Sequence, residues 1–174
     1  MYVHEVIPLM EGLVGTMTAG STKKPTTRVT AWVEGCKAVL RMPQHRGLSD
    51  WAFKCMPDVD ESADAIVASG TLFAMLAGYV DEAKNLCVVV EDGADASLTV
   101  TGATDVLGLY VAQFNCPMVA TAGTEEYTGA IWPGGISSAS GSMNIGCDTT
   151  DSTTVATDDC RVWVLYRTTA GLVA

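Results

Sequence analysis

Positive charge is scarce in this chain, and in its second half it is almost absent. Residues 85–174 contain only Arg161 and Arg167 against ten Asp and Glu residues, and the whole chain has a formal net charge of -10. Such a surface repels phosphate groups, so we do not expect nucleic acid as a partner. The one basic cluster, Lys23–Lys24 with Arg28 nearby, lies among threonines and a proline and is typical of a solvated loop.

Charged residues of either sign are also few. They make up 17% of the 174 residues, whereas about 25% is usual for a soluble domain. Hydrophobic residues make up 48%, which argues against a disordered chain, and the length is sufficient for one domain with a sizeable core. A chain of this size with so few charges often covers part of its surface with a partner. The composition therefore favours an oligomer or an assembly subunit over a free monomer.

The sequence lacks the motifs of metal and cofactor sites. None of its six cysteines forms a C-x-x-C pair, and its two histidines, His4 and His45, lie outside any zinc-site spacing. We therefore expect no cofactor, and we expect thiols rather than disulfides, as in a reducing compartment. Two acidic segments, residues 58–64 and 148–159, leave calcium binding open, although neither has the glycine and the final glutamate of an EF-hand loop.

Motifs of catalysis, secretion and membrane insertion are missing too. The sequence has no phosphate-binding loop, no dinucleotide-binding motif and no zinc-protease motif, so we predict that the chain is not an enzyme. The first residues lack the basic segment of a signal peptide. The longest uncharged stretch, residues 65–80, is shorter than the roughly 20 residues of a membrane span, and glycines interrupt it. We expect no contact with a membrane.

Short runs of β-branched and aromatic residues indicate an all-β fold. The strongest is residues 161–167, where apolar side chains point to both faces and an arginine closes each end, so this strand is predicted to lie in the middle of a sheet. A short helical turn is expected near 61–67. Turn residues separate the other predicted strands, which are residues 28–34, 37–42, 71–76, 86–90, 97–101, 106–114 and 143–147. The pattern predicts a single-domain β-sandwich or jelly roll of seven to eight short strands.

The first 27 residues do not fit this pattern. They are apolar, but Pro8 and several glycines interrupt them, so we predict an extended N-terminal arm over residues 1–27 and a β-sandwich domain over residues 28–174. An apolar arm without regular structure needs a surface to cover, and in an assembly subunit that surface belongs to a neighbour. We therefore predict a homo-oligomer, most simply a trimer. The predicted interface residues are Val3, Val6, Ile7, Leu9, Met10, Leu13 and Trp132.

The order of elements over residues 66–167 resembles a known family. A small apolar strand ends at residues 76–78, a valine strand follows at 87–90, then come Ser97–Val100 and a glycine turn, and the chain returns in residues 161–166. This order is similar to that of the small β-sandwich virion proteins encoded among the head genes of tailed phages. The chain departs from their pattern at Ala77, where the family has a proline.

The resemblance implies a structural role without catalytic residues. The expected function is that of a decoration or cement subunit that binds the outside of a viral shell, with the viral capsid protein as its partner. The expected location is the virion, after assembly in the host cytoplasm. Two alternatives remain open. One is a jelly-roll coat protein that forms the shell itself. The other is a carbohydrate-binding module that uses Trp32, Trp51 and Trp132 as sugar platforms.

Overall fold

The computed structural model describes residues 1–19, 27–56, 64–67, 70–79, 86–92, 110–116, 126–137, 143–149 and 160–168. Within these ranges the chain forms two α-helices, one short 3-10 turn and eight β-strands. The helical elements are α1 (Val3–Ala19), α2 (Thr27–Leu40) and the turn Pro43–His45. The strands are β1 (Trp51–Met56), β2 (Asp64–Val67), β3 (Gly70–Tyr79), β4 (Leu86–Asp92), β5 (Tyr110–Cys116), β6 (Glu126–Ser137), β7 (Met143–Thr149) and β8 (Cys160–Thr168).

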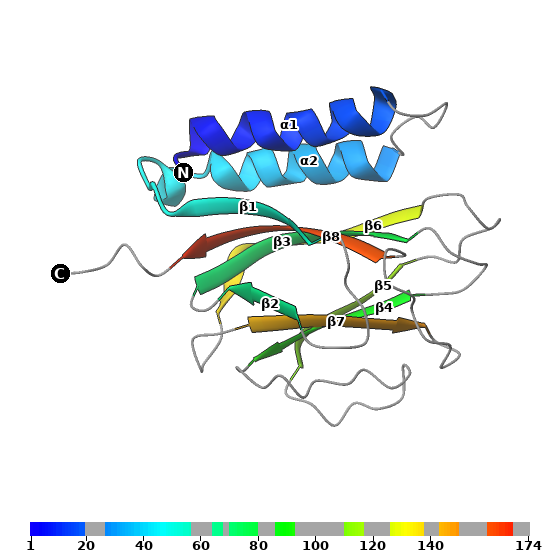
Figure 1. Cartoon of the computed structure of the whole chain (residues 1–174). Coiled ribbons are helices and arrows are strands. Elements are labelled where there is room, and N and C mark those ends of the chain that lie inside the picture. The colour runs from blue at the N-terminus through cyan, green and yellow to red at the C-terminus, as the bar shows by residue number, and fades with distance from the viewer. Residues whose placement is uncertain are drawn as a thin grey trace.

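The strands form two four-stranded sheets, and the helices form a third layer (Figure 1). The first sheet has the order β1-β8-β3-β6 and the second has the order β2-β7-β4-β5, and neighbouring strands in both sheets are antiparallel. Helices α1 and α2 lie side by side over the outer face of the first sheet. The predicted β-sandwich is confirmed, and a helix layer that was not predicted is added to it.

Strand β8 occupies the central position predicted for it. It pairs with β1 on one side and with β3 on the other. Val162 and Val164 share one face of this strand and Trp163 and Leu165 share the other, and all four side chains are buried. The apolar character of both faces is explained because each face of the first sheet is covered, one by the helices and one by the second sheet.

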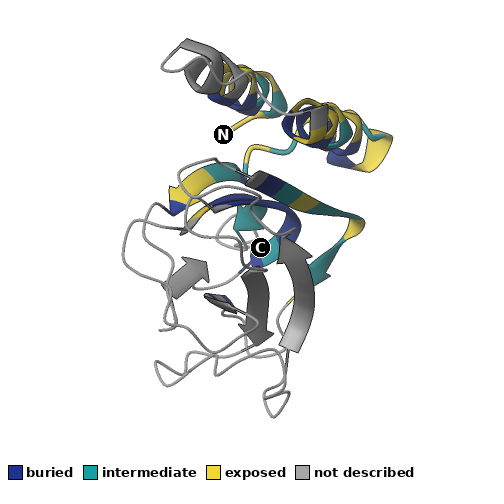
Figure 2. Cartoon of the chain, turned by 90° about the vertical axis from the view of Figure 1, so that its right-hand side faces the viewer, coloured by how far each residue is buried: buried dark blue, intermediate teal, exposed yellow. Residues whose placement is uncertain are grey.

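The larger described core lies between the helices and the first sheet. Both helices turn their buried side chains toward the sheet and their exposed side chains away from it (Figure 2). The helices contribute Val6, Met10, Leu13, Val29, Trp32, Val33, Cys36, Val39 and Leu40 to this core. The sheet contributes Trp51, Phe73, Ala74, Leu76, Tyr127, Trp163 and Leu165. A β-bulge at Phe73 lets two successive residues of β3 face the helices.

Eight further buried apolar residues lie outside that cluster. They are Met56, Leu72, Met75, Ala77, Met143, Ile145, Val162 and Val164. The strand alternation places the six that belong to the first sheet on the face opposite the helices. Met143 and Ile145 belong to β7 of the second sheet. These residues form the core between the two sheets.

The prediction of an extended arm at the N-terminus is wrong in its conformation. Residues 3–19 form helix α1, with Pro8 inside it. Val6, Met10 and Leu13 recur at helical spacing, so one face of the helix is apolar even though a proline and glycines interrupt the sequence. The carboxylate of Glu5 accepts the backbone N–H of Tyr2 at 2.6 Å, which satisfies a donor at the helix start. The proposed domain boundary at residue 27 stays a prediction.

Residues 28–42 were predicted as two strands, and they belong instead to helix α2 and the start of the following turn. The alternation in 28–34 competes with a helical pattern, because Val29, Trp32, Val33 and Cys36 also fall on one helical face. The helix is favoured because it turns its whole apolar face onto the sheet, and Gly35, which would mark a turn in a strand, is accommodated within it.

The remaining expectations have mixed outcomes. Strands β3, β4 and β7 cover the predicted strands 71–76, 86–90 and 143–147, and β5 overlaps the predicted strand 106–114. Strands β1 and β6 were not predicted, and β2 replaces the expected helical turn in residues 64–67. The predicted strand 97–101 lies outside the described residues.

Helix α2 and strand β6 approach each other closely through two glycines. A methyl group on Gly129 would overlap the indole ring of Trp32, and one on Gly35 would overlap the end of the Ile131 side chain. The indole Nε1 of Trp32 donates to the carbonyl oxygen of Ala130 at 3.3 Å. Each glycine therefore receives a large side chain from the opposite element, and this fixes the position of the helix on the sheet.

The two glycines should respond differently to substitution. In G129A the added methyl group meets a buried ring that has no free space, so we expect a loss of about 1–3 kcal/mol in the free energy of unfolding. In G35A the added group meets only the flexible end of Ile131, and alanine improves the helix by about 1 kcal/mol, so a change near zero is expected. Urea denaturation of both variants measures this difference. Equal losses would contradict the close contact between Trp32 and Gly129.

The central position of β8 can be tested with a side chain on its helix-facing side. Trp163 is 8% exposed and its ring lies 6.0 Å from that of Tyr127. We expect W163A to lower the free energy of unfolding by roughly 3–5 kcal/mol, as other large-to-small core substitutions do. R161A in the same strand removes an exposed side chain and should cost less than about 0.5 kcal/mol. A cost under about 1 kcal/mol for W163A would place β8 at the periphery.

Candidate functional site

The segment after helix α2 makes a compact turn. Pro43 starts the short 3-10 turn, because proline cannot donate the backbone hydrogen bond that a continuing α-helix requires. Backbone bonds from His45 to Met42 (2.9 Å) and from Arg46 to Pro43 (3.3 Å) close this turn. Gly47 follows with a φ of +79°, a conformation that other residues rarely adopt, and directs the chain into β1.

The start of α1 is attached to the same segment. The amino group of Met1 donates to the carbonyl oxygens of Ser49 and Trp51, each at 2.8 Å. The backbone N–H of Trp51 donates in turn to the carbonyl oxygen of Met1 at 3.2 Å. These bonds hold the first turn of α1 beside the residues that follow the end of α2.

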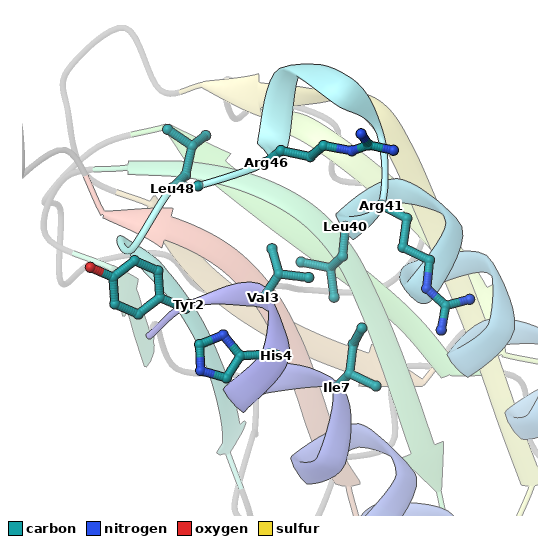
Figure 3. Close-up of a pocket in the computed structure, with 9 residues that line it drawn as sticks. Tyr2, Val3, His4, Ile7, Leu40, Arg41, Arg46 and Leu48 are labelled. Carbon is teal, nitrogen blue, oxygen red and sulfur yellow. The ribbon is translucent and has the colours of Figure 1, made fainter.

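A pocket of about 480 Å³ lies between these two segments (Figure 3). Its apolar lining comes from Val3, Ile7, Leu40 and Leu48. Its polar lining comes from Tyr2, His4, Arg41 and Arg46, together with the backbone of Gly47. The aromatic ring of Tyr2 stacks on the imidazole of His4, with ring centres 5.7 Å apart. The pocket therefore has an apolar floor and a rim with two guanidinium groups.

The electrostatics of the pocket differ from those of the rest of the chain. No acidic residue lines it, and within the described part of the chain neither Arg41 nor Arg46 has an ion-pair partner. Lys37 bridges Glu11 and Glu34 at 2.9 and 2.8 Å, which joins α1 to α2. The hydrogen bonds that Lys37 donates to these two carboxylates raise its pKa, with the bond to Glu34 the larger cause. The pocket is thus suited to an anionic group attached to an apolar body.

Next to the pocket, the side chain of His45 is buried in an aromatic cluster. Its ring meets the rings of Trp51 and Phe73 edge to face, with centres 5.1 and 5.2 Å apart. Neither ring nitrogen of His45 has a hydrogen-bond partner, and the indole nitrogen of Trp51 has none either. Burial lowers the pKa of His45, and the nearby charge of Arg167 lowers it further. Burial therefore disfavours the charged form of this imidazole.

An ion pair closes this cluster on the side of β8. Arg167 donates to both carboxylate oxygens of Asp50, at 2.9 and 2.7 Å, and its guanidinium lies 5.7 Å from the centre of the Trp51 ring. The hydrogen bonds from Arg167 lower the pKa of Asp50. The backbone N–H of Thr168 also donates to the carbonyl oxygen of Asp50 at 3.0 Å. The pair links the turn after α2 to the end of the central strand.

The predicted interface residues separate into two groups. Val6, Met10 and Leu13 are buried in the chain's own core, where they face α2 and the sheet. Val3 and Ile7 line the pocket, and Leu9 is 48% exposed. Trp132 lies half-buried on β6, away from this group in the sequence. The structure therefore brings Val3 and Ile7 together in the pocket, whereas Leu9 lies on another side of α1. It adds Tyr2, Arg41, Arg46 and Leu48, which the sequence did not single out.

The other sequence-based sites are answered only in part. Trp32 and Trp51, proposed as sugar platforms, are buried in the core and cannot present a flat face to a sugar. Within the described residues no cluster of three or more metal-ligating side chains occurs, and most of the acidic residues considered for calcium lie outside those residues. None of the described helices is long and apolar enough to cross a membrane.

Two of the six cysteines can be assigned from the structure. Cys36 and Cys55 carry thiols rather than a disulfide, as predicted. Burial raises the pKa of Cys36 to about 12, so this thiol stays protonated and acts as a small apolar side chain of the core. The side chains of the other four cysteines lie outside the described part of the chain.

His45 should make stability depend on pH in a defined range. Because its pKa is lower in the folded chain, the unfolded chain binds the proton more tightly, and stability should fall as the pH drops below about 6.5. The lowered pKa of Asp50 acts in a separate range, since its contribution is lost only below about pH 4.

The substitution H45F should remove the first of these effects. An apolar ring of similar shape leaves no unsatisfied nitrogen, so the free energy of unfolding at pH 7 should change by less than about 1 kcal/mol, and the fall between pH 7 and pH 5 should shrink. H4F, at an exposed histidine, is the matched control and should keep the wild-type profile. Urea denaturation at the two pH values provides the test. An unchanged fall in H45F would show that another group is responsible.

The chain matches no protein-family model and no curated protein. Among solved structures it is similar to the Tobacco streak virus coat protein at 2.1 Å resolution, with a TM-score of 0.34 and 13% identity over 74% of this chain and 92% of that chain. The coat protein dimer of the same virus at 2.4 Å gives a TM-score of 0.34 and 13% identity over 78% of this chain and 93% of that chain. A TM-score this low does not establish a shared fold, so the architecture described above rests on the chain's own strand pairing.

Proposed function

We propose that this chain is a non-enzymatic structural protein of a virion, a decoration subunit that binds the outside of a viral shell as a homo-oligomer. The observation that carries the proposal is an apolar surface at the start of α1. Met1, Tyr2 and Leu9 are the exposed large hydrophobic residues of the described chain, with 39%, 48% and 48% of their surface accessible. Met1 and Tyr2 directly precede α1, Tyr2 lines the pocket, and Leu9 lies within the helix. Exposed apolar groups that gather beside charged ones are typical of protein-binding surfaces.

The layered scaffold supports a structural role. Both faces of the first sheet are covered by apolar contacts, and the ion pairs of Lys37 join α1 to α2. Hydrogen bonds from the amino group of Met1 to Ser49 and Trp51 hold the start of the chain against this scaffold. Binding through such a surface orders few residues, and this reduces the entropy cost of assembly. The resemblance to small β-sandwich virion proteins supports the virion as the location. The thiols of Cys36 and Cys55 agree with assembly in a reducing cytoplasm.

A coat protein that forms the shell itself is the second candidate. The stack of two four-stranded sheets favours it, because jelly-roll proteins of this kind build viral shells. A coat that encloses nucleic acid needs basic residues on its inner surface, whereas the net charge of this chain is -10. We therefore place the decoration role first. Electron microscopy of the purified chain separates the two candidates, because a coat protein would form closed shells and a decoration protein would form small discrete oligomers.

The oligomer can be measured directly. Three copies of the 18.2 kDa chain have a mass of about 55 kDa, and we expect native mass spectrometry to show this species at micromolar concentration. L9E places a charge on the exposed apolar surface and should raise the dissociation constant about tenfold or more without altering the fold. A31E makes the same change at an exposed position on α2 and should assemble as the wild type does. A wild-type chain that remains at 18.2 kDa would refute the homo-oligomer.

A further inference from the structure

We propose that the pocket between α1 and the turn after α2 receives a carboxylate-bearing segment of a second copy of this chain. The inference rests on the proposed function, because it names the contact through which the subunits assemble. It is carried by two features that coincide in the pocket. These are two guanidinium groups without an ion-pair partner in the described chain and an apolar floor beside them (Figure 3).

The arginines of the pocket differ from other cations of the described chain. Lys37 and Arg167 are already neutralised by carboxylates at hydrogen-bonding distance. Arg41 and Arg46 are exposed, line the same pocket and have no acidic residue beside them in its lining. A guanidinium group binds a carboxylate through two parallel hydrogen bonds, so such a pair at a pocket rim selects an anion with defined geometry.

The apolar floor excludes a bare anion as the natural occupant. Val3, Ile7 and Leu48 are only partly buried within one copy, although each also packs against the main core. An occupant with an apolar side chain next to its carboxylate would cover them and exclude water from the ion pairs, which strengthens those pairs. A segment of folded protein with an acidic residue beside an apolar one has this composition.

Charge complementarity identifies the second copy as the source of that segment. Residues 85–174 hold ten acidic residues and two arginines, so a second copy carries an excess of carboxylates over basic groups in this half of its sequence. Another copy offers carboxylates at an effective concentration that rises as the oligomer forms.

The charge of the pocket limits which surfaces can meet. A contact of one pocket with another would bring four guanidinium groups together, and this is unfavourable. The pocket of one copy therefore meets an acidic surface of the next, and a head-to-tail repetition of this contact agrees with the proposed trimer.

The double variant R41E/R46E tests the pocket. We expect its oligomer to dissociate about 100-fold more readily than the wild type, because two attractive contacts become repulsive. R28E/R161E changes two exposed arginines elsewhere by the same charge and should assemble normally. Circular dichroism checks that each variant is folded, and R41Q/R46Q replaces the charge reversal if it is not. Wild-type dissociation should also increase between about 50 and about 500 mM NaCl.

Cross-linking identifies the occupant. In R46K a carbodiimide can join the introduced amine to a carboxylate that lies against it, and a mixture of 14N- and 15N-labelled chains shows whether the link joins two copies. The expected product is an intermolecular peptide pair that contains position 46 and an Asp or Glu. The control R28K should give no such pair. Links formed only within one copy, or links to no carboxylate, would overturn the proposal.

These experiments distinguish a failure of the proposed pocket contact from a failure of the proposed structural function. A wild-type oligomer that is unaffected by R41E/R46E would refute the contact and leave the structural role standing. A wild-type chain that is monomeric at every concentration would refute the homo-oligomer, and the contact with it. Vesicles containing anionic lipid and a short single-stranded RNA serve as competing probes. Saturable binding of either one that is lost in R41E/R46E would assign the pocket to that ligand instead.

Discussion

The first sheet has large apolar side chains on both faces, and it must be covered on both. The second sheet covers one face, and the helices α1 and α2 cover the other. Without the helix layer, Trp51, Phe73 and Trp163 would face water together, an exposed apolar surface that a soluble chain rarely tolerates. The order of layers follows from this requirement, and the pocket lies where α1 begins and α2 ends.

The helix layer is held in place by shape as well as by apolar burial. Trp32 from α2 lies over Gly129 of β6, and Ile131 of β6 lies over Gly35 of α2. Apolar burial alone would allow the helix to slide along the sheet, because it depends on area and has no direction. The interlocked side chains and the hydrogen bond from Trp32 to Ala130 prevent this sliding and fix one position of the helix. These contacts fix the position of α2 along the sheet, and with it the positions of Arg41 and Arg46, which follow the end of the helix.

The sequence allowed the β-sandwich to be predicted, but it did not allow the helix layer over the first sheet to be predicted. The predicted central position of β8 in its sheet is correct. Residues 162–165 are apolar on both faces, and only a central strand that is covered on both sides buries all four side chains. The helices were missed because Pro8 and several glycines resemble loop residues, while the alternation in 28–34 resembles a strand. Strand β6 was missed because Pro133 and three glycines interrupt its β-branched pattern. In each case a contact with a distant element outweighs the local preference.

The pocket could not be found from the sequence, because its two sides are about 40 residues apart and have no motif in common. The structure also shows why deletion of α1 would not test its exposed face alone. Val6, Met10 and Leu13 on its inner face complete the core, whereas Tyr2 and Leu9 are exposed. Removal of the helix would uncover the outer face of the first sheet as well as the proposed contact surface. Deletion of the helix would therefore disturb folding whatever its effect on the proposed assembly, and only substitutions on its exposed face can test that proposal by itself.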